Sequence, residues 1–264
     1  MTMLPEAASA HAGDIDQVIH YVHWLMAALF VGWGAFFIYV LVRFRRSRHP
    51  KADYTGVKSK TSTWLEVAVA ALEAVLLIGF SIPLWADRVD RIPPESQSTV
   101  VRVLAQQFAW NVWYPGADGV FGRTDISLMD EATNPVGLDR DDPAGKDDIT
   151  TINQLHVPVG KPAIIHLSSK DVIHSFNLPH MRIKQDVIPG MRIPVWFVPT
   201  MTTAEMRRKK GKDAFNYEIS CAQLCGNSHY SMRGFMTVET PDEYAAWLAE
   251  EASRLQTTED DWAE

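Results

Sequence analysis

The fold and the chemistry of this 264-residue chain are decided by one stretch, Cys221-Ala222-Gln223-Leu224-Cys225-Gly226-Asn227-Ser228-His229-Tyr230-Ser231-Met232. It holds both cysteines of the sequence, with a histidine four residues after the second cysteine and a methionine three residues later. A further histidine stands apart in Asp171-Val172-Ile173-His174-Ser175-Phe176. Thiolates, imidazoles and a thioether select copper or zinc over magnesium or calcium. The spacing lets one tight loop enclose a soft-metal site that His174 closes from another segment.

Simpler interpretations of the same residues are open. Two cysteines could form a disulfide in an oxidising compartment, and a lone methionine or histidine is most often core filler or a surface residue. A structural zinc loop usually has C-x2-C-type spacing and does not need a thioether. A single blue-copper ion needs one cysteine, two histidines and a weak axial methionine, so one cysteine is surplus here. The surplus is explained if two thiolates bridge two copper ions, each completed by one histidine and one weak axial ligand.

The loop resembles subunit II of haem-copper cytochrome c oxidases, the subunit with the binuclear CuA centre, as do two more stretches, Asp171-Val172-Ile173-His174-Ser175-Phe176-Asn177-Leu178-Pro179 and Lys184-Gln185-Asp186-Val187-Ile188-Pro189-Gly190. The resemblance covers about residues 15–250, and the loop is its most specific part. It implies that two copper ions are bridged by the thiolates of Cys221 and Cys225 and bound by the imidazoles of His174 and His229. The axial ligands it implies are the Met232 thioether and the main-chain carbonyl of Gln223.

Gln223 is a departure from the pattern of the family. Members commonly have glutamate at this position, and in many of them its side chain contributes to a magnesium site at the border with subunit I. The copper ligand at this position is the backbone carbonyl, so the resemblance implies that Gln223 also supplies it. The substitution leaves open whether the magnesium site is kept.

Two apolar blocks predict a transmembrane hairpin over residues 21–86. Residues 21–42 contain no Asp, Glu, Lys or Arg, and residues 64–86 contain two glutamates. Each block is long enough to cross a bilayer as a helix. Between them, residues 43–63 hold seven basic residues and one acidic residue, so the positive-inside rule places this loop in the cytoplasm. Residues 1–20 lack Lys and Arg, unlike a signal peptide, and are interpreted as an external lead-in.

This topology places both ends of the chain outside a bacterial-type inner (plasma) membrane, with the C-terminal domain on the periplasmic or extracellular side. Carboxylates within a span are costly and should face a partner helix or a water path rather than lipid. Glu66 lies near the cytoplasmic end of its span, where the resemblance implies a glutamate at the mouth of a proton-uptake path of subunit I. For Glu73 we expect an inter-subunit hydrogen bond.

Beyond a linker at residues 87–99, the helical pattern gives way to short segments in which apolar and polar residues alternate, separated by Pro and Gly. They predict an antiparallel sandwich or barrel over residues 100–240, and the resemblance implies a cupredoxin-like Greek-key barrel. Thr240-Pro241-Asp242-Glu243 has the pattern of a helix N-terminus, so residues 241–264 are predicted to form a C-terminal helix and an acidic tail.

Aromatic residues cluster in Gln107-Phe108-Ala109-Trp110-Asn111-Val112-Trp113-Tyr114. Core and cross-strand packing explains most of them. The resemblance implies an aromatic patch here through which electrons arrive, and its usual tryptophan aligns with Phe108. Strand alternation places Trp110 on the same face as Phe108. Residues 87–264 contain 26 acidic and 18 basic residues, a net charge of −8, which would attract a basic donor.

Other charged segments have ordinary interpretations. The acidic residues between 129 and 150 match no EF-hand spacing and predict an exposed loop. The basic run at 207–212 is interpreted as a solvated turn and not as a nucleic-acid contact. His156, His166 and His180 have no ligand partner at a recognisable spacing, and packing or surface positions account for them.

The resemblance implies an electron-accepting subunit. Cytochrome c or an equivalent external donor would reduce the copper pair, and the electron would pass to haem in subunit I, which also holds a further copper and reduces oxygen to water while protons are pumped. The implied partners are subunits I and III and membrane lipids. Three alternatives are weaker: a quinol oxidase subunit would lack these ligands, a nitrous-oxide-reductase type protein would not need two spans, and a copper carrier would have no obligatory partner.

Overall fold

The computed structural model describes residues 4–52, 54–56 and 58–260. Residues 1–3 of the predicted lead-in, 53 and 57 of the predicted loop, and 261–264 of the acidic tail lie outside the described residues. The chain divides into two compact units. One is the segment Gly13–Arg91, and the other combines the N-terminal residues up to Ala12 with the chain from Ile92 onward.

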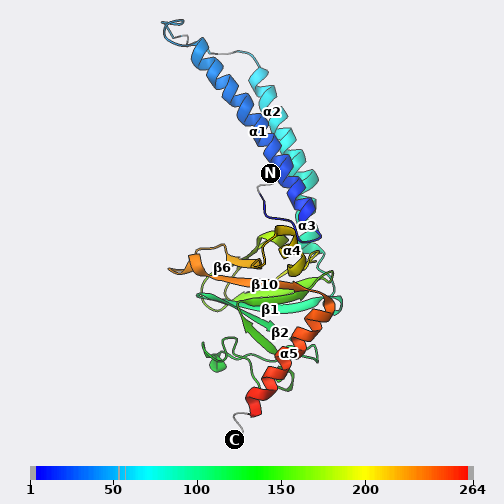
Figure 1. Cartoon of the computed structure of the whole chain (residues 1–264). Coiled ribbons are helices and arrows are strands. Elements are labelled where there is room, and N and C mark those ends of the chain that lie inside the picture. The colour runs from blue at the N-terminus through cyan, green and yellow to red at the C-terminus, as the bar shows by residue number, and fades with distance from the viewer. Residues whose placement is uncertain (1–3, 53, 57, 261–264) are drawn as a thin grey trace. The chain divides into compact units, whose positions relative to one another are not determined.

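The first unit is a helical hairpin (Figure 1). Helix α1 spans Ala12–Arg43, and the returning helix is α2 (Thr61–Leu76), a π-helical turn (Leu77–Ser81) and α3 (Ile82–Asp90) in succession. Both helices are long and apolar enough to cross a membrane. Helix α1 begins at Ala12, so the helix extends into the predicted lead-in.

The π-helical turn has a local cause in the sequence. Pro83 lies in the first turn of α3 and has no backbone N–H to continue the helical ladder, and its ring crowds the preceding turn. A π-turn widens the helix there and relieves the crowding. The hydroxyl of Ser81 donates to the carbonyl of Leu76 at 3.3 Å. Pro83 therefore produces a widened turn inside the helix, which continues to Asp90 instead of stopping shortly after the proline.

The second unit is a two-sheet β-sandwich, and it confirms the predicted fold class. One sheet has the order β3-β2-β1-β5-β8 and the other β4-β10-β9-β6-β7 (Figure 1). The bounds are β1 Thr99–Gln106, β2 Ala109–Tyr114, β3 Ile149–Ile152, β4 Gln154–Pro158, β5 Ala163–Ser169, β6 His174–Leu178, β7 Ile183–Val187, β8 Ile193–Phe197, β9 Tyr217–Cys221 and β10 Arg233–Glu239. Two pairs, β1 with β5 and β10 with β4, are parallel, so the predicted purely antiparallel arrangement is wrong for them.

Strand alternation builds the core between the two sheets. In β1 every second residue is buried, including Val101, Val103 and Ala105, while the residues between them face outward and are partly exposed. The largest fully buried side chains include Trp110 from one sheet and Phe176 from the other. His174, at the start of β6, and Cys221, at the end of β9, stand at one end of this packed scaffold.

Two helices accompany the sandwich. Helix α5 (Pro241–Asp260) begins with the predicted capping box, in which Thr240 and Glu243 bond each other's backbone N–H groups. Helix α4 (Thr203–Lys210) contains most of the basic run that the sequence predicts as a turn. That prediction is wrong because Thr202 and Glu205 form a second capping box, whose spacing is present in the sequence.

The N-terminal segment packs on the sandwich. The backbone N–H of Ala8 donates to the carbonyl of His180 at 2.8 Å, and the carbonyl of Ala8 accepts from Thr200 at 2.9 Å. Ser9 is buried and its hydroxyl donates to the carbonyl of Met181 at 2.8 Å. Part of the predicted lead-in is therefore an ordered component of the β-unit.

The acidic segment after β2 also packs more than the sequence predicts. Val136 and Leu138 are buried against Trp113 in a small apolar cluster on the outer face of the β1–β2 sheet. Asp148 is completely buried and accepts hydrogen bonds from the Trp113 indole and from Gly122. The prediction of an exposed loop over 129–150 holds for carboxylates such as Asp130 and is wrong for these residues.

Candidate metal centre

The site lies where three neighbouring strands end or begin. Strand β6 starts at His174, β9 ends at Cys221, and β10 starts directly after Met232. Strands β6 and β9 are paired through Phe176 and Cys221, and the Cys221 N–H donates to the Met232 carbonyl at 3.2 Å. Pairing of these strands thus fixes both ends of the loop, and the separate His174, at the same end of the sheet.

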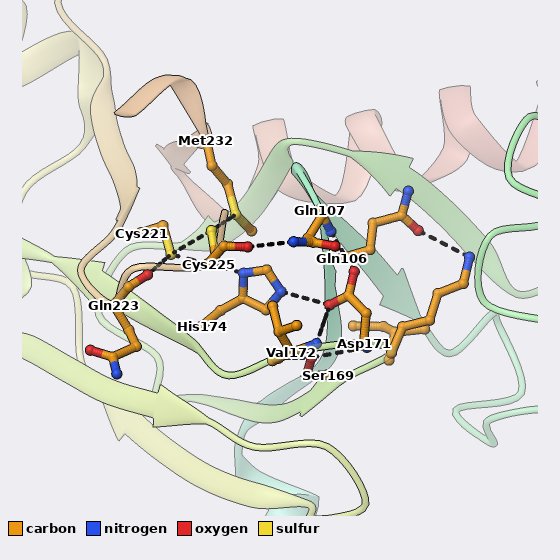
Figure 2. A network of polar contacts seen from close by, with 12 residues as sticks. Gln106, Gln107, Ser169, Asp171, Val172, His174, Cys221, Gln223, Cys225 and Met232 are labelled. Atoms are coloured by element: carbon orange, nitrogen blue, oxygen red, sulfur yellow. Dashed lines mark hydrogen bonds and ion pairs between the residues drawn. The ribbon is translucent and has the colours of Figure 1, made fainter. Parts of the chain in front are cut away.

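The two cysteines face each other across the site (Figure 2). Their sulfur atoms lie 3.8 Å apart, and both thiols are free. The Cys221 sulfur is 3.9 Å from His174 Nδ1 and 3.2 Å from the Gln223 carbonyl oxygen. Each of these atoms is a donor that soft or borderline metals accept.

The second sulfur has a matching set of neighbours. Cys225 Sγ lies 3.6 Å from His229 Nδ1 and 3.7 Å from Met232 Sδ. Each thiol therefore has one imidazole nitrogen and one weaker donor beside it, and the six predicted ligand groups are brought together. The ligand atoms of His174 and both cysteines lie within 4.8 Å of one another.

Three of the six donor residues are shielded from water. His174 is fully buried, and Cys225 and Met232 are 3% and 2% exposed. Burial, reinforced by the neighbouring Cys221 thiol, raises the pKa of Cys225 to about 11. A metal ion that binds here must therefore displace a proton from this thiol. Thiolate pairing with a cation would replace the hydrogen bond between the two sulfurs.

Asp171 sets the orientation of the His174 ring. Its carboxylate Oδ1 lies 2.8 Å from Nε2, on the side of the ring opposite the sulfurs (Figure 2). Burial raises the pKa of Asp171, but hydrogen bonds from His174 and from the backbone N–H groups of Gln107 and Val172 outweigh it, so the net pKa is lowered. An ionised Asp171 holds the proton on Nε2 and leaves Nδ1 free as a donor to a metal.

Gln107 connects the β1–β2 turn to the copper loop, the residues 221–232 that hold five of the six predicted copper ligands. Its side-chain amide donates to the carbonyl of Cys225, and its backbone N–H donates to Asp171 at 2.7 Å. Gly226, the residue after Cys225, has a φ of +140°. A Cβ added to it would lie 2.7 Å from the Gln107 amide nitrogen and 3.0 Å from Phe108 Cζ. A glycine at this position lets the loop turn closely against Gln107 and Phe108.

The donor chemistry fits copper. The two thiols converge without a bond between them, each beside its own imidazole, and a thioether and a carbonyl lie at the weaker positions. Copper accepts this mixture of thiolate, imidazole and thioether. Main-chain ligation by Gln223 needs no particular side chain, and the Gln223 amide points away from the sulfurs (Figure 2).

The two predicted electron-input rings occupy different positions. Phe108 lies in the turn between β1 and β2 and is partly buried against the main core. Trp110 is completely buried, with its ring 6.1 Å from His174 and 5.4 Å from Phe176 in edge contacts. Because Phe108 lies in the turn before β2 begins, the expectation that both rings share a face stays a prediction. Glu66 lies on α2 of the hairpin unit and is exposed.

Sequence reasoning missed two residues that hold the site. Asp171 precedes His174 by three residues, and a carboxylate at this spacing from a candidate ligand is a signal that could have identified it. Gln107 gives no such signal, because its contact with Cys225 joins residues 118 positions apart. Only the folded arrangement of the turn and the loop reveals it.

Known proteins share this sequence pattern. The profile of a family described as cytochrome c oxidase subunit II, periplasmic domain, matches residues 99–239. The alternative cytochrome c oxidase subunit 2 of Bradyrhizobium diazoefficiens is 34% identical over 90% of this chain and 80% of its own length. Cytochrome c oxidase subunit 2 of Synechocystis sp. is 27% identical over 95% of this chain and 76% of its own length.

Among solved structures, the periplasmic domain of subunit II of cytochrome oxidase from Bradyrhizobium japonicum aligns with a TM-score of 0.42 and 25% identity, over 62% of this chain and 99% of that one. The matched profile spans more than half of the present chain, and two apolar helices followed by this domain fit a two-pass membrane protein. The chain therefore belongs to the cytochrome c oxidase subunit II family, whose named members are subunits of an oxidoreductase complex.

Proposed function

We propose that this chain is the electron-accepting subunit of a haem-copper terminal oxidase and holds a binuclear CuA centre. The observation that supports this most directly is the symmetric pair of thiols, 3.8 Å apart, each beside its own histidine. One metal ion would use three or four of these donors and leave others idle. Two ions sharing both thiolates would use all six groups.

A copper pair bound at Cys221, Cys225, His174, His229, Met232 and the Gln223 carbonyl would supply a one-electron carrier. The protein's contribution is to keep this donor set fixed. Strand pairing holds Cys221 and His174, and a hydrogen bond from the Gln107 side chain holds the Cys225 carbonyl. Rigid ligands need little rearrangement when the charge of the site changes, and burial of His174 and Met232 excludes competing water.

Two aromatic rings provide a contact between the surface and the ligands. Phe108 lies against Gly226 of the copper loop, and Trp110 contacts the ring of His174 from within the core. The external donor would be a basic protein such as cytochrome c, attracted by the net charge of −8 on residues 87–264. In this proposal, Phe108 lies closer to the docked donor, and Trp110 supports the ligand.

Stopped-flow mixing of the assembled oxidase with reduced cytochrome c tests electron input. Phe108→Leu and Trp110→Phe should each slow copper reduction while the visible and near-infrared copper spectrum stays unchanged, because neither ring is a ligand. Phe235→Leu, at an exposed position on β10, is the matched control and should reduce at the wild-type rate. Unchanged rates in both Phe108→Leu and Trp110→Phe would reject this path.

The electron would next pass to haem in subunit I, where oxygen is reduced to water and protons are pumped. Subunits I and III would surround the hairpin together with membrane lipids. The basic loop at 43–63 favours a cytoplasmic position, so both termini and the copper domain would lie on the outer side of the plasma membrane.

For Glu66 we propose a role in proton uptake at the cytoplasmic end of the second span. Glu66→Gln keeps the size of the side chain but cannot carry a proton, so turnover and the proton-to-electron ratio of the reconstituted oxidase should fall. Glu73→Gln is the control: Glu73 lies deeper in the same helix, an amide can still form the hydrogen bond expected there, and turnover and pumping should stay at wild-type values. Wild-type turnover and pumping in Glu66→Gln would remove Glu66 from the mechanism.

A further inference from the structure

A second feature of the β-unit lies apart from the copper ligands. A cavity of about 290 Å³ opens on the outer face of the sheet that contains β1, β2 and β5. The segment between β2 and β3 forms its other wall. Its lining includes Arg102, Leu104, Trp113, Val136, His166 and Arg192. None of the six proposed copper ligands contributes to it.

Strand register places the polar wall of this cavity. Arg102 on β1 is paired with Trp113 on β2 and with His166 on β5, so the three side chains stand side by side on one face. Arg192 immediately precedes β8, the strand next to β5. Two arginines and a histidine thus converge on one space whose remaining walls are largely apolar.

Neither arginine has its positive charge matched by an adjacent carboxylate. Across the described residues, Arg102 and Arg192 form no hydrogen bond or ion pair, and the Nε of Arg102 is buried without a partner. Burial, together with the nearby charge of Arg192, lowers the pKa of Arg102 to about 10, although Asp148 and Glu95 oppose the shift. Two cations held near each other favour an anion between them.

The acidic groups nearest the cavity already have hydrogen-bond partners. Asp148 accepts from the Trp113 indole and from the backbone of Gly116 and Gly122. Glu95 lies 3.0 Å from His166 Nε2, and the other ring nitrogen of His166 is buried without a partner among the described residues. The unmatched groups at the cavity are therefore mainly cationic or polar.

Packing explains only part of this arrangement. The Arg102 guanidinium lies 4.8 Å from the Trp113 ring centre and 4.0 Å from that of Phe121, so cation–π contacts account for its position. Those contacts leave the edge of the guanidinium free to bond an oxyanion. They do not account for Arg192, which is exposed and contacts neither ring.

We propose that this cavity binds a small organic anion, with its carboxylate or phosphate group between Arg102 and Arg192 and its apolar part against Trp113 and Val136. Arginine suits this role because its planar group forms paired hydrogen bonds with either oxyanion. The volume is at the lower end for ligand pockets and limits the ligand to a small molecule. The cavity shares no residue with the six proposed copper ligands, so its test is independent of the proposed electron transfer.

Ligand binding to the full chain in nanodiscs tests the proposal by isothermal titration calorimetry with phenyl phosphate, benzoate and uncharged benzyl alcohol. At least one of the anions should bind, more weakly as salt increases, and benzyl alcohol should bind at least tenfold more weakly. Arg192→Gln should weaken anion binding about tenfold, the size expected for loss of a charge-assisted hydrogen bond. Arg192 is exposed, so this change spares the core.

Two further variants separate recognition from general charge or folding. Lys184→Gln removes the same charge from an exposed position on the other sheet and should leave anion affinity unchanged. Arg102→Lys keeps the charge but loses the planar fork, and should also weaken binding. Binding of phenyl phosphate alone would assign the ligand to phosphates, and binding of benzoate alone to carboxylates. No anion binding, equal binding of benzyl alcohol, or wild-type affinity in Arg192→Gln would overturn the proposal.

Discussion

The ring of His174 depends on a single carboxylate for its orientation. Asp171 bonds Nε2, so Nδ1 points to the Cys221 sulfur, 3.9 Å away. The same carboxylate accepts the backbone N–H of Gln107, whose side chain holds the carbonyl of Cys225. At the scale of the residue, Asp171 therefore connects both halves of the copper site without being a ligand.

Asp171→Asn should lower copper affinity by about 10- to 100-fold, the usual effect of removing a group that orients a metal-bound histidine. An amide can still occupy the space, but it does not hold the proton on Nε2 as a carboxylate does. Competition with a copper chelator measures the change. Asp213→Asn, at an exposed position, removes an equal charge and serves as the control. Equal affinity in the two variants would show that Asp171 does not orient the ligand.

At the scale of the element, the loop between β9 and β10 determines where the ligands stand. Gly226 gives this loop a backbone conformation with φ of +140° and a close approach to Gln107. A side chain at this position would meet the amide that donates to the Cys225 carbonyl. The loop is thus shaped by contact with the β1–β2 turn as well as by its own sequence.

Gly226→Ala should cost about 1–3 kcal/mol of stability through backbone strain and should also displace Gln107, so copper affinity falls. Gly160→Ala is the matched control, because Gly160 has a φ of +77° and an added Cβ there would meet nothing within 4 Å. Thermal unfolding and chelator competition measure the two effects. Both variants should lose stability, and only Gly226→Ala should lose copper. Full copper affinity in Gly226→Ala would contradict the proposed packing.

Elements whose signal is local were predictable from sequence. Helix α5, for example, begins at its predicted capping box. Helix α4 was missed because its basic composition outweighed a capping box that was equally visible. The burial of Val136 and Leu138 had no local signal, since it depends on an outward-facing Trp113 in a distant strand pair.

At the scale of the whole molecule, the division into a helical hairpin and a β-unit follows from hydropathy. The two apolar blocks and the change to short alternating segments predict it without any knowledge of contacts. The assignment of residues 4–12 to the β-unit was not predictable, because the bonds of Ala8 to His180 and Thr200 join distant positions. The ligand types and their spacing were local, whereas the supporting contacts of Gln107 were not.

The proposal for the whole molecule depends on two copper ions that share Cys221 and Cys225. Electron paramagnetic resonance of the oxidised, copper-loaded protein, with its copper content measured on the same sample, tests this directly. The account predicts two coppers per chain and a hyperfine pattern of one unpaired electron spread over both nuclei. A spectrum of a single copper nucleus, or a silent sample that contains zinc or a disulfide between the two cysteines, would contradict it.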